Sequence, residues 1–277
     1  MTLAPAAAAL APAPVRRPSY AVLVSFCAAA VLLIPLAWWG PGLAAWGLCV
    51  ALLLQNGNRA AQLRMGALLA VILLLAIVPI GTELTLANFL RLGSAFLGAL
   101  LVPLFILRRE RPRVIEYRIL PRGLDRLECA YVVLSVPVAW AVVSVYFFKW
   151  TPQMPLQWPL AADHGAAQVT QFITGINCVG IWDELFFINT VYAVLRSLYP
   201  ARAANLAQAV VYTSVLTDMA FIGAGPPIVF VFALIQGVMY ERARTLLYVL
   251  VVHLIVDAFL VAAVLHYHFP GMPRVFF

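Results

Sequence analysis

Long, continuous apolar runs constrain this chain more than any other feature. Of its 277 residues, 64% are hydrophobic and 10% are charged, whereas soluble domains are about 45–50% apolar and about 25% charged. A water-soluble fold and a disordered chain are therefore both excluded. The runs also lack the alternation of polar and apolar residues that is typical of membrane β-strands. The sequence thus predicts an all-α, polytopic transmembrane helical bundle.

Nine apolar segments are candidate membrane spans. Three of them are short for a hydrocarbon core of about 30 Å, so we expect eight or nine spans. The segments are Tyr20–Trp39, Leu43–Gln55, Gly66–Ile80, Leu84–Leu107, Tyr131–Phe148, Thr170–Leu195, Ala203–Phe221, Ile228–Met239 and Leu246–Leu265.

The placement of arginine predicts the orientation. If the N-terminus is cytoplasmic, the cytoplasmic segments hold fifteen of the 18 Lys and Arg residues, and the opposite side holds Lys149 and Arg274. Cytoplasmic loops carry such an excess of basic residues. The net charge of +7 therefore reflects topology, and we expect the lipid bilayer, not nucleic acid, as the partner. Short loops and the excess of Arg over Lys favour a bacterial inner membrane.

Composition divides the chain into five segments. Arg16 and Arg17 follow the first apolar stretch, so that stretch is predicted to be a tail and not a signal peptide. The basic segment is predicted to be an interfacial helix or loop at anionic headgroups. The segments are a disordered Ala/Pro-rich tail (1–18), N-terminal transmembrane helices (19–148) with the cytoplasmic basic segment (108–128), an outer loop (149–169), a helical core (170–265) and a C-terminal tail (266–277).

Ionisable residues inside the apolar segments mark the candidate site. Each costs about 2.5–3.5 kcal/mol at the centre of a membrane. Arg91 lies near the outer end of its segment, where snorkelling explains it. The other five are clustered in the C-terminal third of the chain: Asp183, Glu184, Asp218, His253 and Asp257.

Two adjacent carboxyl groups, Asp183 and Glu184, lie near the middle of a long apolar segment. In a medium of low dielectric constant two neighbouring carboxyls do not both ionise readily. Such a pair suits a base that activates water. The structural alternative is a pair neutralised by hydrogen bonds to a neighbouring helix.

His253 and Asp257 lie four residues apart and share one helix face. The aspartate would orient the imidazole and fix its tautomer, or the pair would hold two helices together. Asp218 lies near the outer end of its segment, where facing water is the alternative.

Further polar side chains lie on the same segments. They either line a wet cavity or link helices, and their concentration near the carboxylates favours a cavity. They are Asn177, Asn189, Gln208, Ser214, Thr217 and Gln236. The cysteines lie singly, without a CxxC pair, which predicts buried free thiols: Cys27, Cys49, Cys129 and Cys178.

From Thr170 to Leu265 the sequence resembles the CPBP family, the CAAX-processing type II proteases and their bacteriocin-processing or self-immunity relatives. DELFFI at 183–188, followed by Asn189, has the shape of the family motif EExxxR. The stretch from Phe232 to Leu260 carries HLIVD in the manner of HxxxN or HxxxD. The resemblance implies hydrolysis of a peptide bond in a membrane-anchored or lipidated protein, without a cofactor.

The resemblance also implies roles for individual residues. Asp183 stands at the water-activating glutamate and Glu184 at the second acidic position. His253 and Asp257 stand at the pair that binds the developing oxyanion. Ile188 replaces the motif arginine, and Asp218 replaces the histidine of FxxxH, where it would share a proton with the other carboxyls.

Three other readings stay open on the residues alone. They are a catalytically inactive immunity or scaffold protein, a proton-coupled transporter in which the carboxylates relay protons, and a metal site. The metal site is disfavoured because HExxH is absent and a single histidine is a poor zinc ligand set. We therefore expect no metal.

Overall fold

A computed structural model describes residues 17–121, 123, 125–160, 165–218, 221–269, 271 and 276. Within them the chain is helical and contains no strand, which confirms the all-α prediction. Most of the tail at 1–18, part of the outer loop and half of the C-terminal tail lie outside these residues. The helices are α1 (Tyr20–Leu33), α2 (Trp39–Asn56), α3 (Arg59–Ile77), α4 (Leu86–Leu107), α5 (Arg126–Val145), α6 (Ala166–Asp183), α7 (Ala193–Arg196), α8 (Ala201–Asp218), α9 (Gly225–Ala243) and α10 (Leu247–His268), with π-helical turns at Tyr146–Trp150 and Glu184–Tyr192 and a 3-10 turn at Met154–Gln157.

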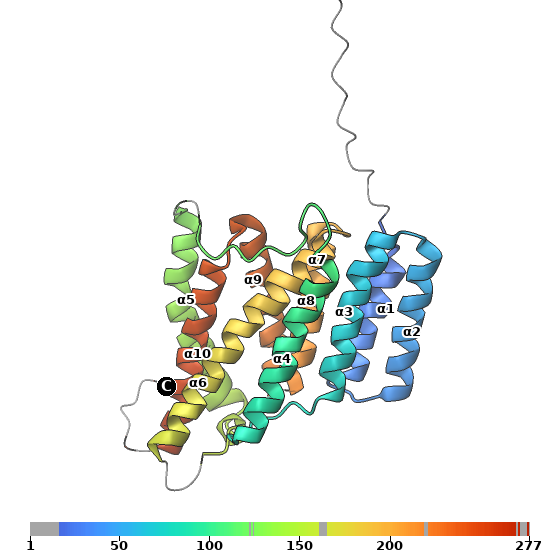
Figure 1. Ribbon diagram of the computed structural model, residues 1–277. Helices are drawn as coiled ribbons and strands as arrows, with labels where there is room; N and C mark the ends of the chain where they lie inside the picture. Colours follow the sequence, from blue (N-terminus) through green and yellow to red (C-terminus); the bar gives the residue numbers. More distant parts are fainter. Residues whose placement is uncertain are drawn as a thin grey trace, which may run out of the picture.

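The helices stand side by side, with α1–α3 at one edge of the bundle and α5 and α10 at the other (Figure 1). Five of them are long and apolar enough to cross a membrane: Arg59–Ile77, Leu86–Leu107, Arg126–Trp150, Ala166–Arg196 and Leu247–His268. The described helices therefore agree with a membrane protein. The count of eight or nine spans and the cytoplasmic N-terminus stay predictions.

Several helix bounds differ from the apolar segments. The predicted span Tyr20–Trp39 is divided, because α1 ends at Leu33 and α2 begins at Trp39. The start of α3 lies seven residues before the predicted Gly66, at Arg59, where the Asn58 side chain caps the backbone amides of Ala60 and Ala61. Capping and helix propensity extend helices into polar residues that an apolar pattern leaves out.

One end of the bundle is rich in arginine. The segment between α4 and α5 is a loop that crosses this end (Figure 1). Among the described residues of the predicted basic segment, only 126–128 are helical. The carbonyls of Arg118 and Ile119 accept hydrogen bonds from the amides of Leu246 (2.9 Å) and Leu247 (3.1 Å). An ion pair joins Arg64 of α3 to the same loop. We call this the arginine-rich end.

The opposite end, which we call the loop end, comprises residues 78–85, 151–160 and 221–224. Its segments are joined to each other. The Thr82 hydroxyl donates to the Gln157 carbonyl, and the Tyr146 hydroxyl donates to the Ile222 carbonyl at 2.8 Å. The turn at Gly223, with a positive φ of 61°, connects α8 to α9 here.

The longest helical segment runs through α6, the π-helical turns and α7, from Ala166 to Arg196. Trp182 anchors it to α4: its indole N–H donates to the Phe96 carbonyl at 2.8 Å, and the two rings stack with centroids 4.0 Å apart. The π-helical stretch begins at Glu184. A π turn is wider than an α turn and is frequent at functional sites, so this register change marks the segment that carries the acidic pair.

Buried amides join α8 to α9. Asn205 donates to the Leu234 carbonyl at 2.9 Å, and Gln208 donates to the Ala233 carbonyl at 2.8 Å. Gly237 of α9 lies directly against them, because a Cβ at this position would overlap the Asn205 side-chain oxygen. The absence of a side chain therefore permits both amide contacts.

We expect Gly237→Ala to lower the melting temperature of the protein in detergent, since overpacking at a close helix contact costs about 1–3 kcal/mol. Gly47→Ala in α2 is the matched control, because its Cβ would meet nothing within 4 Å and alanine is favoured over glycine in a helix. Equal melting temperatures for the two variants would contradict the close contact.

Candidate active site

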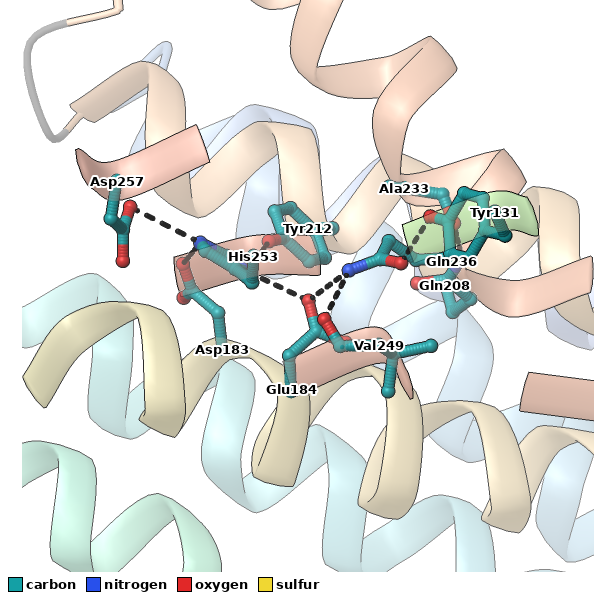
Figure 2. A network of polar contacts seen from close by, with 10 residues as sticks. All are labelled: Tyr131, Asp183, Glu184, Gln208, Tyr212, Ala233, Gln236, Val249, His253 and Asp257. Carbon is teal, nitrogen blue, oxygen red and sulfur yellow. Dashed lines mark hydrogen bonds and ion pairs between the residues drawn. The ribbon is translucent and has the colours of Figure 1, made fainter. Parts of the chain in front are cut away.

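Four predicted site residues form one cluster, in which three carboxyl groups surround the imidazole of His253 (Figure 2). Its Nδ1 lies 2.7 Å from Glu184 Oε1. On the other side of the ring, Nε2 lies 3.7 Å from Asp183 Oδ2 and 3.6 Å from Asp257 Oδ1. All four side chains are buried. The structure thus brings together groups that are nearly seventy positions apart in the sequence.

The Nδ1 side of His253 is held by a polar network. Glu184 Oε1 also accepts a hydrogen bond from Gln236 Nε2 at 2.9 Å, and Gln236 Nε2 lies 2.9 Å from the Val249 carbonyl. The Tyr131 hydroxyl donates to Gln236 Oε1. Helices α5, α9 and α10 therefore all position Glu184, which in turn positions the ring of His253.

A fourth helix contacts the histidine through Tyr212 of α8. Its hydroxyl lies 3.2 Å from His253 Nδ1, and the two rings face each other. The predicted contribution of α8 was Asp218, the last residue of this helix. The Asp218 side chain lies outside the described residues, so its role stays a prediction.

Gly180 allows α6 and α10 to approach at the site. A Cβ at Gly180 would overlap the Asp257 carboxylate and would lie 2.9 Å from His253 Cδ2. The helix carrying Asp183 can therefore lie against the helix carrying Asp257 only where a side chain is missing. Sequence reasoning did not select this glycine, although it lies one turn before the acidic pair.

An apolar cavity of about 420 Å³ ends at the site. Asp183, His253 and Asp257 line it, whereas Glu184 is not among its described lining residues. Two other lining residues, Leu97 of α4 and Cys178 of α6, are exposed. The cavity therefore opens on the surface of the bundle between α4 and α6, and Asp183 faces it while Glu184 lies behind.

Two carboxylate oxygens at the cavity wall have acceptor capacity to spare. Within the described residues, Asp183 Oδ1 and Asp257 Oδ2 have no hydrogen-bond partner. Both belong to side chains that line the cavity, although both atoms are themselves buried. The described part of the chain contains no group of three His, Cys, Asp or Glu side chains arranged to hold a metal ion.

The six uncharged polar residues were predicted to line a cavity. None of them is among the described lining residues of the cavity at Asp183, so that prediction is wrong for this cavity. Asn189 accepts a hydrogen bond from Tyr240 at 2.6 Å, and Gln208 and Gln236 also bond to neighbouring helices. The other three bond to carbonyls of their own helices: Asn177, Ser214 and Thr217. Amides in a membrane thus link helices here.

Two further predictions concern Arg91 and the cysteines. Arg91 bonds to Asn88 at 2.6 Å and lies 3.8 Å from Glu83 at the loop end; its snorkelling stays a prediction. All four cysteines are free, as predicted, but only Cys49 is buried. Cys27 and Cys129 are half-buried, and Cys178, which lines the cavity, is exposed.

Residues 165–259 match the family model described as type II CAAX prenyl endopeptidase Rce1-like. The match covers α6 through most of α10 and includes all four residues around His253. It confirms the resemblance seen in the sequence. No curated protein and no solved structure shows significant similarity to the chain.

The close contact at Gly180 predicts thermodynamic coupling with Asp257. We expect Gly180→Ala to destabilise the protein in detergent, and to do so less when Asp257→Ala has removed the overlapping carboxylate. Contacting residues show coupling of about 0.5–3 kcal/mol in such cycles. The measurement is a double-mutant cycle of denaturant unfolding.

Gly66→Ala provides the control for this cycle, because its Cβ would meet nothing within 4 Å. Its effect is expected to add to that of Asp257→Ala. If Gly180→Ala costs the same free energy in both backgrounds, the described packing of α6 against α10 is wrong.

Proposed function

We propose that the chain is an intramembrane endopeptidase, because residues 165–259 match the Rce1-like model of type II CAAX prenyl endopeptidases. The proposed reaction is hydrolysis of a peptide bond in a membrane-anchored or lipidated protein, with water activated by a carboxylate. One observation carries the proposal: His253 Nε2 lies between Asp183 and Asp257 at the wall of an apolar cavity.

Asp183 is the proposed general base. It lines the cavity, and its Oδ1 has no described partner, so it can accept a proton from a water molecule. As that proton moves to Asp183, the water oxygen bonds to the peptide carbonyl carbon. The tetrahedral intermediate then collapses, the C–N bond breaks, and Asp183 returns the proton to the leaving amine. No acyl-enzyme forms.

His253 and Asp257 are proposed to stabilise the oxyanion. A protonated His253, with Nδ1–H donated to Glu184, directs Nε2–H toward the cavity. Asp257, when protonated, offers a second donor from the same helix face. Donors fixed before the reaction and aimed at developing charge contribute several kcal/mol in a water-poor site.

Glu184 is proposed as a positioning residue. It is fully buried and touches His253 on the side away from the cavity. A carboxylate there fixes which ring nitrogen carries a proton and how the ring is oriented, as in other carboxylate–histidine pairs. The sequence resemblance assigned two acidic positions, and the geometry supports different tasks for them.

The departure at Ile188 is compatible with this proposal. Ile188 replaces the motif arginine and is fully buried in the apolar core. The carboxylates are instead joined by His253 and Gln236. A helix broken inside the membrane would favour a transporter. The segment GAGPP at 223–227, the candidate for such a break, instead belongs to the connection between α8 and the start of α9, so it gives the transporter reading no support.

We expect Asp183→Asn to abolish cleavage, because an amide cannot accept the proton; loss of a general base typically costs about 10²–10⁴-fold in rate. Glu184→Gln is expected to cost less, since the amide oxygen can still accept a hydrogen bond from His253. The measurement compares new protein termini in membranes of the native host lacking the endogenous gene, complemented with each variant.

Glu116→Gln, an exposed glutamate in the loop before α5, is the matched control and should behave as wild type. All variants must be expressed and inserted equally. Identical terminal profiles for wild type and Asp183→Asn would remove the protease proposal and leave a partner-binding or transport role.

A further inference from the structure

The cavity lies on one side of the site only. Beyond His253 it continues along residues 88–100 of α4 and residues 172–183 of α6 to the loop end, where Thr82, Glu83 and Trp158 line it. No described residue of the loop at 108–125 is among its lining. The hollow at the arginine-rich end, lined by residues 113–118 and the end of α4, shares no described lining residue with it.

The arginine-rich side of the site is closed by packed polar contacts. Glu184 and Gln236 are fully buried there. Beyond them, Tyr240 donates to Asn189 at 2.6 Å, and Tyr117 of the loop bonds to Thr190 at 3.1 Å. Opening this side would break these hydrogen bonds between buried polar groups, which is costly.

Charge assigns the two ends to the two faces of the membrane. The loop between α4 and α5 contains six of the fifteen basic residues that define the orientation predicted above. It crosses the arginine-rich end of the bundle (Figure 1), the end toward which the site is closed. Basic loops face the cytoplasm. The cavity therefore extends from His253 away from the cytoplasm.

We propose that substrate reaches His253 from the extracytoplasmic side, through the opening between α4 and α6. The substrate class is then a protein with an apolar membrane anchor whose scissile bond lies at the extracytoplasmic end of that anchor. The direction of access is inferred from the cavity and the charge asymmetry. That the entering chain is a substrate rests on the proposed function.

The chemistry of the lining fits such a segment. Most lining side chains are apolar, among them Phe89, Phe96 and Leu97. The polar ones include Thr82 and Glu83 at the loop end, besides the ionisable residues of the site itself. An apolar chain would thus lie between α4 and α6 while its polar flank stays at the loop end. The volume is in the range of cavities that hold ligands of a few hundred daltons, about 300–1,000 Å³.

Thiol labelling from each side of the membrane tests the direction of access. The probe is a methanethiosulfonate that carries a trimethylammonium group and does not cross bilayers. It is applied to intact spheroplasts and to inside-out vesicles containing the full-length protein, and labelled peptides are mapped by mass spectrometry. Cys178, which lines the cavity, is the native reporter. Thr174→Cys, one turn nearer the loop end, is the second.

Gly123→Cys, in the loop between α4 and α5, is the control for the opposite face, because a Cβ there meets nothing within 4 Å. We expect Cys178 and Thr174→Cys to be labelled in spheroplasts and to lose labelling in inside-out vesicles, with the reverse for Gly123→Cys. Labelling of both cavity positions from the cytoplasmic side overturns the proposal. The proposal is also overturned if neither cavity position is labelled in spheroplasts or in inside-out vesicles.

This result is independent of catalysis, because labelling reports access in an inactive protein as well. If labelling follows the expected pattern but no termini depend on Asp183, the proposed function fails and the direction of access stands. If termini do depend on Asp183 and lie at cytoplasmic ends of membrane anchors, the proposed substrate class is wrong.

Discussion

The short contact between Glu184 and His253, 2.7 Å long and fully buried, is the interaction on which the site depends. A buried charge without a partner is costly, and a buried polar pair is retained only where its hydrogen bonds are satisfied. Gln236 supplies the second bond to Glu184, and Tyr131 fixes Gln236. Four helical segments are thereby held around one imidazole. The Nε2 side of its ring lies at the cavity wall, near Asp183 and Asp257.

The sequence was sufficient to find the charged members of the site. Asp183, Glu184, His253 and Asp257 were selected because each is expensive inside an apolar segment, and a cost of that size identifies a residue without any structure. Tyr131 and Tyr212 were not selected, since a tyrosine in an apolar helix is ordinary. Gly180 carries no chemistry at all; its role appears only when α6 and α10 are seen in contact.

Other parts of the fold were predictable to different degrees. Composition indicated an all-α bundle, because the apolar runs are long and uninterrupted. Composition did not indicate the bounds of α1 and α3. Capping by Asn58 and the break before Trp39 depend on local geometry and not on hydropathy. The different positions of Asp183 and Glu184 were likewise not predictable from the sequence. The two residues are adjacent in the chain, but Asp183 lines the cavity and Glu184 is not among its described lining residues.

The central claim is that a carboxylate at position 183 activates the attacking water. The most direct test is the turnover number of purified protein in liposomes, with a substrate identified from its termini, for wild type, Asp183→Glu and Asp183→Asn. The account predicts that Asp183→Glu retains measurable turnover and that Asp183→Asn loses about 10²–10⁴-fold. Turnover by Asp183→Asn equal to that of wild type would contradict it.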